Sequence, residues 1–184
     1  EHASPATSFL APNLMGHTAD LETYGRDLDK AKECLAAAGY EAGELTLTLT
    51  MWAQTVQNSM AEIIQAQLGE IGITVNIESL ESAALGTGEI QLGLATNSNT
   101  SGDPGAASKV FKSTNFPKPN YSGLASDEID KLLDEGLACT DPTEREAIYT
   151  KVQQLAAEEC CIIPLCYENE IFGINANLQG FYVS

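Results

Sequence analysis

The chain has 184 residues, of which 43% are hydrophobic, so it is long enough for one domain or one large lobe with a buried core. Its formal net charge is −17, with 26 acidic and 9 basic residues. This balance excludes a nucleic-acid surface, which needs clustered lysine and arginine, and disfavours an anionic membrane surface. No hydrophobic run approaches the ~20 residues of a transmembrane helix.

The N-terminal segment, residues 1–26, carries proline and glycine at irregular spacing and begins with polar residues that do not resemble a signal peptide. We expect this start to be a cut edge of a longer protein and the segment to be an irregular arm. Residues 27–39 predict a helix with Asp27 as its N-cap and Gly39 at its end. Its hydrophobic face contains Leu28, Ala31, Leu35 and Ala38.

Strand and helix patterns alternate in the next part of the chain. Residues 44–52 alternate in hydrophobicity and predict a half-buried strand. Residues 57–71 predict a helix that ends at Gly72, and residues 73–77 predict a second strand. Short connections between these elements imply a right-handed crossover and parallel pairing of the two strands. The hydrophobic face of the helix contains Met60, Ile63, Ile64, Leu68 and Ile71.

Two polar loops follow the predicted sheet. Residues 79–88 are ambiguous, with a short helix expected around 82–85, and residues 89–95 predict a third strand. The polar loop 96–105 is either an ordinary solvent loop or a ligand-binding loop, because open α/β sheets bind ligands where their strands end. A second loop, 115–121, carries aromatic residues.

Two further helices are marked by their N-caps. Ser126 begins the first, and Asp141, followed by proline and then by Glu144, begins the second. We expect residues 161–167 to form an edge strand, and residues 171–174 to form another. The expected buried faces are Ile129, Leu132, Leu133 and Leu137 on the first helix, and Ala147, Ile148, Val152, Leu155 and Ala156 on the second.

From the cysteines and histidines we expect neither a cofactor site nor a metal site. The five cysteines lack a C-x-x-C spacing and an adjacent histidine, which disfavours zinc, and their odd number leaves at least one thiol unpaired within the chain. We expect most of them to be buried as small hydrophobic residues, with any disulfide pairing open. They are Cys34, Cys139, Cys160, Cys161 and Cys166.

Sequence signatures of hydrolases and phosphate-binding loops are missing from the chain, and both histidines lie in the N-terminal segment. Acidic pairs such as Glu158-Glu159 are expected to be solvated, although a secreted hydrolase with paired carboxylates stays as the alternative function. Trp52 ends the first strand, where it either covers the core edge or stacks on a ligand.

Four stretches, taken together and in order, resemble the C-terminal lobe of the solute-binding proteins of peptide-type ABC transporters, the dipeptide, oligopeptide and nickel group. The first two are the helices at 27–40 and 60–73. The third is Gly102-Asp103-Pro104 with Asn120-Tyr121-Ser122 and residues 128–133. The fourth runs from Thr140 through Arg145, Tyr149 and Gln153 into residues 159–167.

The resemblance implies an α/β fold, with a mixed β-sheet flanked by helices, that forms one lobe of a two-lobed type II periplasmic-binding-protein fold. Residues 27–184 would be the C-terminal lobe, entered by the arm 1–26, and the N-terminal lobe would lie outside this chain. The full protein would not be an enzyme. It would be periplasmic or lipid-anchored at the cell surface, and would deliver a peptide or another polar solute to an ABC permease.

The chain departs from this family at two positions that hold charged ligand groups. In dipeptide-binding members an aspartate follows the third strand, whereas residues 96–99 here carry no acid. Those members also have an arginine near the start of the second helix, where this chain has Gln57-Asn58-Ser59. The resemblance therefore favours a longer or blocked peptide, or a neutral oligosaccharide. The expected contacts are Trp52, Asn97, Asn99, Asn120 and Tyr121.

Overall fold

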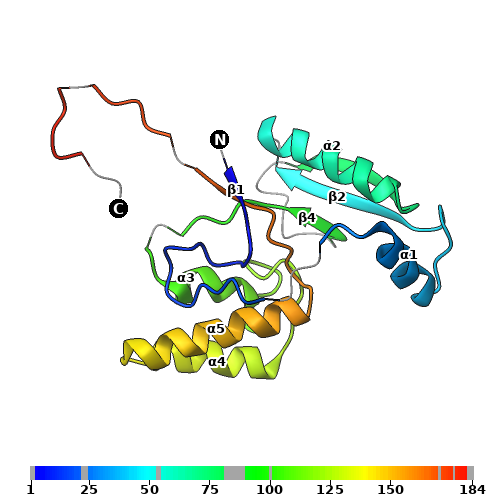
Figure 1. Ribbon diagram of the computed structural model, residues 1–184. Coiled ribbons are helices and arrows are strands. Elements are labelled where there is room, and N and C mark those ends of the chain that lie inside the picture. Colours follow the sequence, from blue (N-terminus) through cyan, green and yellow to red (C-terminus); the bar gives the residue numbers. More distant parts are fainter. Residues whose placement is uncertain are drawn as a thin grey trace.

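A computed structural model of the protein describes residues 3–21, 25–52, 55–80, 90–99, 101–169, 171–175 and 177–181, with the side chains of Trp52 and Thr55 outside the description. The chain forms a sheet body and a helical body, and each has its own hydrophobic core. In Figure 1 the sheet body lies above the helical body, and the C-terminal segment extends away from both.

The sheet body contains three parallel strands in the order β3-β2-β4. They are β2 (Thr46–Trp52), β3 (Thr74–Leu80) and β4 (Leu92–Leu94), and α2 (Thr55–Gly69) connects the first two. The predicted strand–helix–strand unit and its parallel pairing are confirmed. The third strand is shorter than predicted, and the ambiguous segment falls mostly on residues 81–89, outside the described residues.

Helix α2 covers the core of this sheet, which consists of Leu49, Met51, Ala61, Ile73, Val75 and Leu94. Ile63 does not join it, because its side chain is 57% exposed, so that part of the predicted face was wrong. Ala61 is fully buried instead. The helix therefore contacts the sheet along a narrower stripe than its hydrophobic pattern indicates.

Helix α1 (Leu28–Ala37) begins and ends as predicted. The Asp27 carboxylate accepts a hydrogen bond from the Lys30 backbone N–H at 2.9 Å, and Gly39 follows the helix with φ +87°. None of the residues of the helix is buried, and Leu35 is its contact with the sheet core. The helix is thus defined by its local caps more than by tertiary packing.

The helical body consists of short and long helices, and the N-caps of its two long helices match the sequence predictions. It contains α3 (Pro104–Ser108), η1 (Lys109–Phe111), η2 (Ser113–Asn115), α4 (Asp127–Ala138) and α5 (Pro142–Glu158). Ser126 accepts a hydrogen bond from the Ile129 N–H, and Asp141 accepts from the N–H groups of Thr143 and Glu144.

The core of the helical body consists of Leu10, Ala107, Phe111, Leu124, Ile129, Leu133, Tyr149, Val152 and Ala156. Among the predicted core residues, Leu132 and Leu155 pack against this core partly buried. Ala147 is exposed, Leu137 is 66% exposed and Ile148 is half-buried outside this core, so these three predictions were wrong. Tyr149, which the sequence analysis left out of the buried face, is fully buried. Helix α5 is therefore rotated from its expected orientation so that the face carrying Tyr149 points inward.

The N-terminal segment is more ordered than predicted. Strand β1 (Ala3–Pro5) pairs antiparallel with β5 (Cys166–Glu168), with Ser4 opposite Tyr167. The Tyr167 hydroxyl donates to the Ser8 carbonyl at 2.8 Å. Leu10, fully buried, extends this segment into the helical core. Segments from the two ends of the chain thus lie side by side.

The C-terminal part of the chain also differs from prediction. The strand expected at 161–167 is confined to β5, and residues 171–174 are not in a strand. All five cysteines are free and at least partly exposed, so the expected burial of most of them was wrong. No helix in the described parts of the chain combines the length and hydropathy required to cross a membrane.

Candidate functional site

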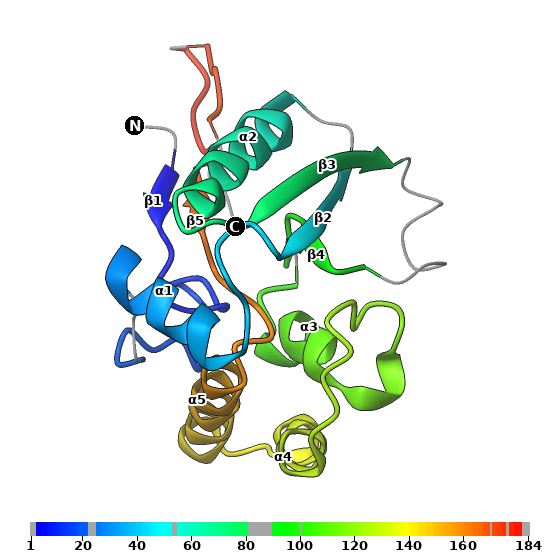
Figure 2. The same cartoon turned by 90° about the vertical axis from the view of Figure 1, so that its right-hand side faces the viewer.

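The three parallel strands end at one edge of the sheet, which we call the carboxyl edge and define as residues 95–99 together with residues 55–59 of α2. Residues 95–99 continue directly from β4, and Figure 2 shows this connection running from the sheet towards α3. Thr96, Asn97 and Ser98 are exposed there. An open α/β sheet binds ligands at this end of its strands, because loops and helix N-termini meet there.

Gln57 connects α2 to this loop. Its side chain is only 3% exposed, and its Nε2 donates to the Thr96 hydroxyl oxygen at 3.5 Å. Its Oε1 is buried without a hydrogen-bond partner in the described structure. A buried amide oxygen without a partner is unusual in a folded protein, because its desolvation is not compensated.

Asn99 closes the loop on itself. Its Nδ2 donates to the Asp103 carbonyl at 2.8 Å, and its Oδ1 accepts from the Ser101 N–H and hydroxyl at 3.2 and 2.7 Å. The side chain that the sequence analysis expected to contact a ligand therefore shapes the loop. Asn97 is exposed at the carboxyl edge, and the side chain of Trp52 lies outside the described residues.

Asn120 and Tyr121 lie in the helical body. Asn120 is fully buried, and its Nδ2 donates to the carbonyls of Lys112 and Leu124 at 3.1 and 2.8 Å. Its Oδ1 accepts from the Ser122 hydroxyl at 3.0 Å. Tyr121 is half-buried. The hydrogen bonds of Asn120 hold its own loop together and do not link it to the loop of Asn99.

A polar cluster of Asp103, Arg145 and Tyr149 fixes the far end of the loop that leaves the carboxyl edge. Arg145 Nη2 donates to both Asp103 carboxylate oxygens at 2.9 and 3.1 Å, and its Nε donates to the Gly136 carbonyl at 2.9 Å. The guanidinium carbon lies 5.1 Å from the centroid of the Tyr149 ring, within cation–π range. Asp103 also caps α3 through the Gly105 N–H at 2.7 Å.

The charges of this cluster stabilise one another. Burial raises the pKa of the Asp103 carboxyl, but the hydrogen bonds and charge of Arg145 and the N–H groups of Gly105 and Ala106 hold it below its usual value. Burial lowers the pKa of Arg145, and the Asp103 carboxylate raises it more. Both side chains are therefore ionised at neutral pH.

The same region is tightly packed, because glycines lie against Tyr149. A Cβ on Gly105 would lie 2.6 Å from the Tyr149 hydroxyl oxygen, and one on Gly136 would lie 2.9 Å from the ring Cζ atom. Both distances are shorter than van der Waals contact. The sequence analysis placed Asp103, Arg145 and Tyr149 in family-like motifs but assigned them no contact with one another.

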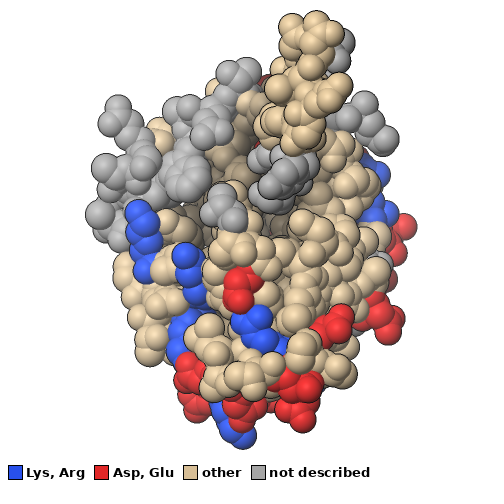
Figure 3. Space-filling model, turned by 90° about the vertical axis from the view of Figure 1, so that its left-hand side faces the viewer, with Lys and Arg blue, Asp and Glu red and all other residues tan. Residues whose placement is uncertain are grey.

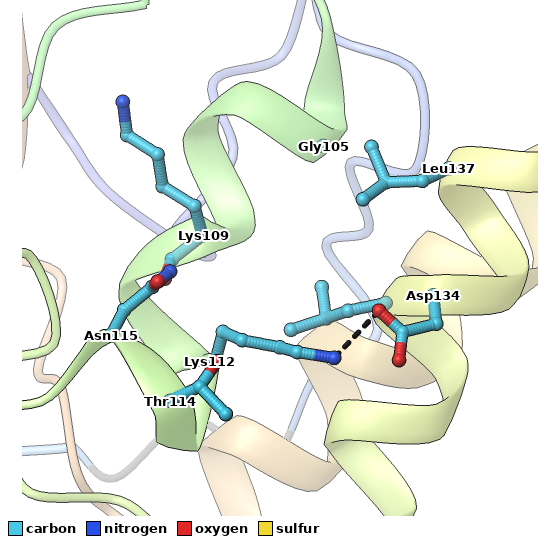
Figure 4. Close-up of a pocket in the computed structure, with 8 residues that line it drawn as sticks. Gly105, Lys109, Lys112, Thr114, Asn115, Asp134 and Leu137 are labelled. Atoms are coloured by element: carbon cyan, nitrogen blue, oxygen red, sulfur yellow. Dashed lines mark hydrogen bonds and ion pairs between the residues drawn. The ribbon is translucent and has the colours of Figure 1, made fainter.

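A pocket of about 240 Å³ lies between α4 and the segment that includes η1 and η2. Figure 4 shows Lys112 reaching across it to Asp134, with 2.6 Å between Nζ and Oδ1, while the Lys109 side chain points away. The side chains of Leu133 and Leu137 form an apolar part of the pocket wall. Since the Lys112 charge is neutralised, this pocket provides little to bind a charged ligand.

In the parts of the chain that the structure describes, no group of three or more potential metal ligands occurs.

Charged side chains are unevenly distributed over the surface. On the face shown in Figure 3, most of the coloured lysine, arginine and acidic residues lie in the lower half, which the helical body forms. Residues 95–99 and 55–59 include no charged residue. The carboxyl edge thus presents hydroxyl and amide groups together with the exposed side chain of Val56.

Comparison with known proteins gives a consistent result. Residues 1–122 match the family described as bacterial extracellular solute-binding proteins, family 5, middle region. The chain is 28% identical to the heme-binding protein A of Haemophilus influenzae over 187 residues, which are 95% of this chain and 34% of that protein. It is 25% identical to the glutathione-binding protein GsiB of Escherichia coli K12 over 194 residues, covering 99% of this chain and 38% of that protein.

Solved structures show the same architecture. The periplasmic binding protein DppA of Helicobacter pylori, in complex with the peptide STSA, superposes with a TM-score of 0.82 at 30% identity, over 91% of this chain and 34% of that one. The predicted α/β class, with sheets flanked by helices in the type II periplasmic-binding-protein fold, is thereby confirmed. The chain spans about a third of the length of the relatives that it matches.

Proposed function

The chain belongs to the bacterial extracellular solute-binding proteins of family 5, and from this premise we propose that it is the C-terminal, ligand-binding lobe of the substrate-binding component of an ABC importer. The observation that carries the proposal is the carboxyl edge. There an exposed polar loop follows a core strand of a sheet that has the fold of this family. In this role the protein binds a solute outside the membrane and delivers it to a permease. It performs no chemical step on the solute.

Three features support the view that residues 27–184 are one lobe of a larger protein. The chain spans 34–38% of the length of its relatives. Strands β1 and β5 bring both ends of the chain out of the lobe together, as a two-stranded connection to a second lobe requires. The C-terminal segment exposes large hydrophobic side chains, which an N-terminal lobe would cover. They are Ile171, Phe172, Ile174, Leu178 and Phe181.

The ligand that fits this edge is polar and uncharged where it contacts this lobe. The loop offers Thr96, Asn97 and Ser98, without a cation for a carboxylate or an acid for an ammonium group. A net charge of −17 further disfavours anionic solutes at long range. A longer or blocked peptide, or a neutral oligosaccharide, has such groups along its length.

The proposed contacts receive unequal support. Asn97 is exposed at the carboxyl edge, and Trp52 ends the strand beside it, so both remain proposed ligand contacts. Asn99 acts on the ligand through the shape of the loop. Asn120 and Tyr121 belong to the helical body, and Asn120 in particular is enclosed by its own loop.

The alternative of a hydrolase with paired carboxylates gains no support. A catalytic acid needs a raised pKa, whereas the pKa of the Asp103 carboxyl is lowered by its pairing with Arg145. Glu158 and Glu159 are exposed at the end of α5.

Native mass spectrometry of the full-length gene product, purified from its own host, tests the proposal. We expect an additional mass that corresponds to a neutral peptide or saccharide and that is lost after unfolding and refolding. The refolded, ligand-free protein is the control and should bind the released compound again without altering it. Breakdown of that compound by the refolded protein would contradict the proposal and favour the hydrolase.

A further inference from the structure

The pair of Gln57 and Thr96 combines a buried and an exposed partner. Gln57 is 3% exposed in the first turn of α2, and Thr96 is exposed two residues beyond the end of β4. Their side chains meet at 3.5 Å, at the outer limit of a hydrogen bond. A buried amide directed at an exposed hydroxyl can control how that hydroxyl is oriented.

The direction of this hydrogen bond determines what Thr96 can offer. The amide Nε2 of Gln57 donates to the hydroxyl oxygen of Thr96, so this hydrogen bond leaves the hydroxyl hydrogen available for donation to another acceptor. The Gln57 Oε1 has no partner within the described structure, although it is buried. Within the described residues the amide is therefore incompletely satisfied, and a buried polar group in this condition calls for an explanation other than stability.

The surroundings favour an uncharged acceptor for this hydroxyl. The positive end of the α2 dipole opposes a cation, while the net charge of −17 opposes an anion. The next acid along the chain, Asp103, is already paired with Arg145. A carbonyl, hydroxyl or ring oxygen carries no net charge, so neither the helix dipole nor the net charge of the chain opposes its binding.

We propose that Thr96 is a ligand-binding residue that donates its hydroxyl hydrogen to an uncharged oxygen of the solute, and that Gln57 is the positioning residue that orients this hydroxyl. The acceptor is a backbone carbonyl of a peptide or an oxygen of a saccharide. This inference rests on the proposed function and names the group of the solute that this lobe selects.

The test measures binding by calorimetry on the full-length gene product with three probes. They are N-acetyl-tetraalanine amide, which is neutral, tetraalanine, which is zwitterionic, and maltotetraose. The variants are Thr96→Val, Gln57→Met and the double variant. Thr46→Val, at the opposite end of β2, and Gln67→Met, exposed on α2, repeat the same chemical changes away from the edge.

We expect a neutral probe to bind more tightly than tetraalanine. If the neutral peptide binds, the acceptor is a peptide carbonyl, and if maltotetraose binds, the acceptor is a saccharide oxygen. Thr96→Val should weaken that binding about 3- to 10-fold, as the loss of one neutral hydrogen bond does. Gln57→Met should weaken it as well, but by little once Thr96 is already valine. A structural role for Gln57 would lower thermal stability without this coupling in affinity.

Several results would overturn the inference. Unchanged affinity in Thr96→Val, which alters an exposed residue and leaves folding intact, would remove Thr96 from the site while the proposed function stands. Additive losses from the two substitutions would remove the positioning role of Gln57. Equal losses of affinity in the control variants Thr46→Val and Gln67→Met would also remove the positioning role of Gln57. Binding of none of the three probes would overturn both the inference and the ligand class of the proposed function.

Discussion

The sheet body and the helical body of this lobe are stabilised in different ways. In the sheet body, three parallel strands pack on α2, and α1 contributes no buried residue. In the helical body, Tyr149 is fully buried against three glycines and contacts an ion pair. The loop 95–103 runs from the first body to the second, so its far end is held by tight packing while its near end stays accessible. The proposed binding edge thus combines an exposed surface with a tightly packed scaffold.

If the helical body depends on tight packing, Tyr149→Ala should have the largest effect on stability. Removal of a buried aromatic side chain costs about 3–5 kcal/mol, and here it also removes the contact with Arg145. Tyr40→Ala, at a tyrosine that is 43% exposed, is the matched control and should cost far less. Urea denaturation measures both. Similar losses for the two variants would show that Tyr149 does not have the central role assigned to it.

Comparing Gly16→Ala with Gly39→Ala separates the cost of overpacking around Tyr149 from the cost of backbone strain. Gly16 has φ +80°, and a Cβ there would clash with the Tyr149 Cβ. Gly39 has φ +87° but open space around it, so Gly39→Ala carries only the conformational cost of about 1–2 kcal/mol. We expect Gly16→Ala to cost about 1–3 kcal/mol more in urea denaturation, because of overpacking. Equal costs would mean that the packing at Gly16 relaxes freely.

Arg145→Met tests the ion pair that holds the end of the loop. The substitution removes the Arg145 hydrogen bonds to the Asp103 carboxylate and to the Gly136 carbonyl, while the N–H groups of α3 still donate to Asp103. We expect a loss of about 1.5–3 kcal/mol. Arg26→Met is the control in the sheet body, since its pair with Glu70 is 2.7 Å long but the two side chains are 57% and 46% exposed. An exposed pair contributes about 0–1 kcal/mol. A larger loss at Arg26 than at Arg145 would reverse the comparison.

The smallest expected effect is a pH dependence from Asp103. Because its pKa is lowered in the folded state, the carboxylate contributes stability above its usual value of 3.8, and this contribution is lost as the pH falls through the folded-state pKa. Asp103→Asn keeps the cap of α3 but removes the charge. The wild type should therefore melt at a higher temperature than Asp103→Asn at about pH 6, and the gap should narrow at about pH 3. A gap that widens on acidification would contradict the lowered pKa.

Local chemistry explains which parts of the fold could be predicted from the sequence. The caps Asp27, Ser126 and Asp141 depend on residues within one helical turn, and all three were located correctly. The parallel pairing of β2 and β3 follows from the short connections around α2. The orientation of α5 was missed, because tyrosine and arginine do not mark a buried face when read by hydrophobicity alone.

For the candidate site as well, local features could be predicted from the sequence and long-range contacts could not. The polar loop after the third strand is visible in the sequence because its composition changes abruptly at Thr96. The bonds from Arg145 to Asp103 and from Gln57 to Thr96 join residues 42 and 39 positions apart, and no local pattern specifies them. Asn120 was expected at the site because it lies in the second predicted loop, whereas its amide holds that loop together.

The most direct test of the central claim, that solute binds at the carboxyl edge, is hydrogen–deuterium exchange on the ligand-loaded and ligand-stripped full-length protein. The account predicts that ligand slows exchange of the backbone amides at residues 95–99 and 55–59, and leaves residues 109–115 and 133–137 around the pocket of Figure 4 unchanged. Protection confined to the pocket residues, with none at the carboxyl edge, would contradict it.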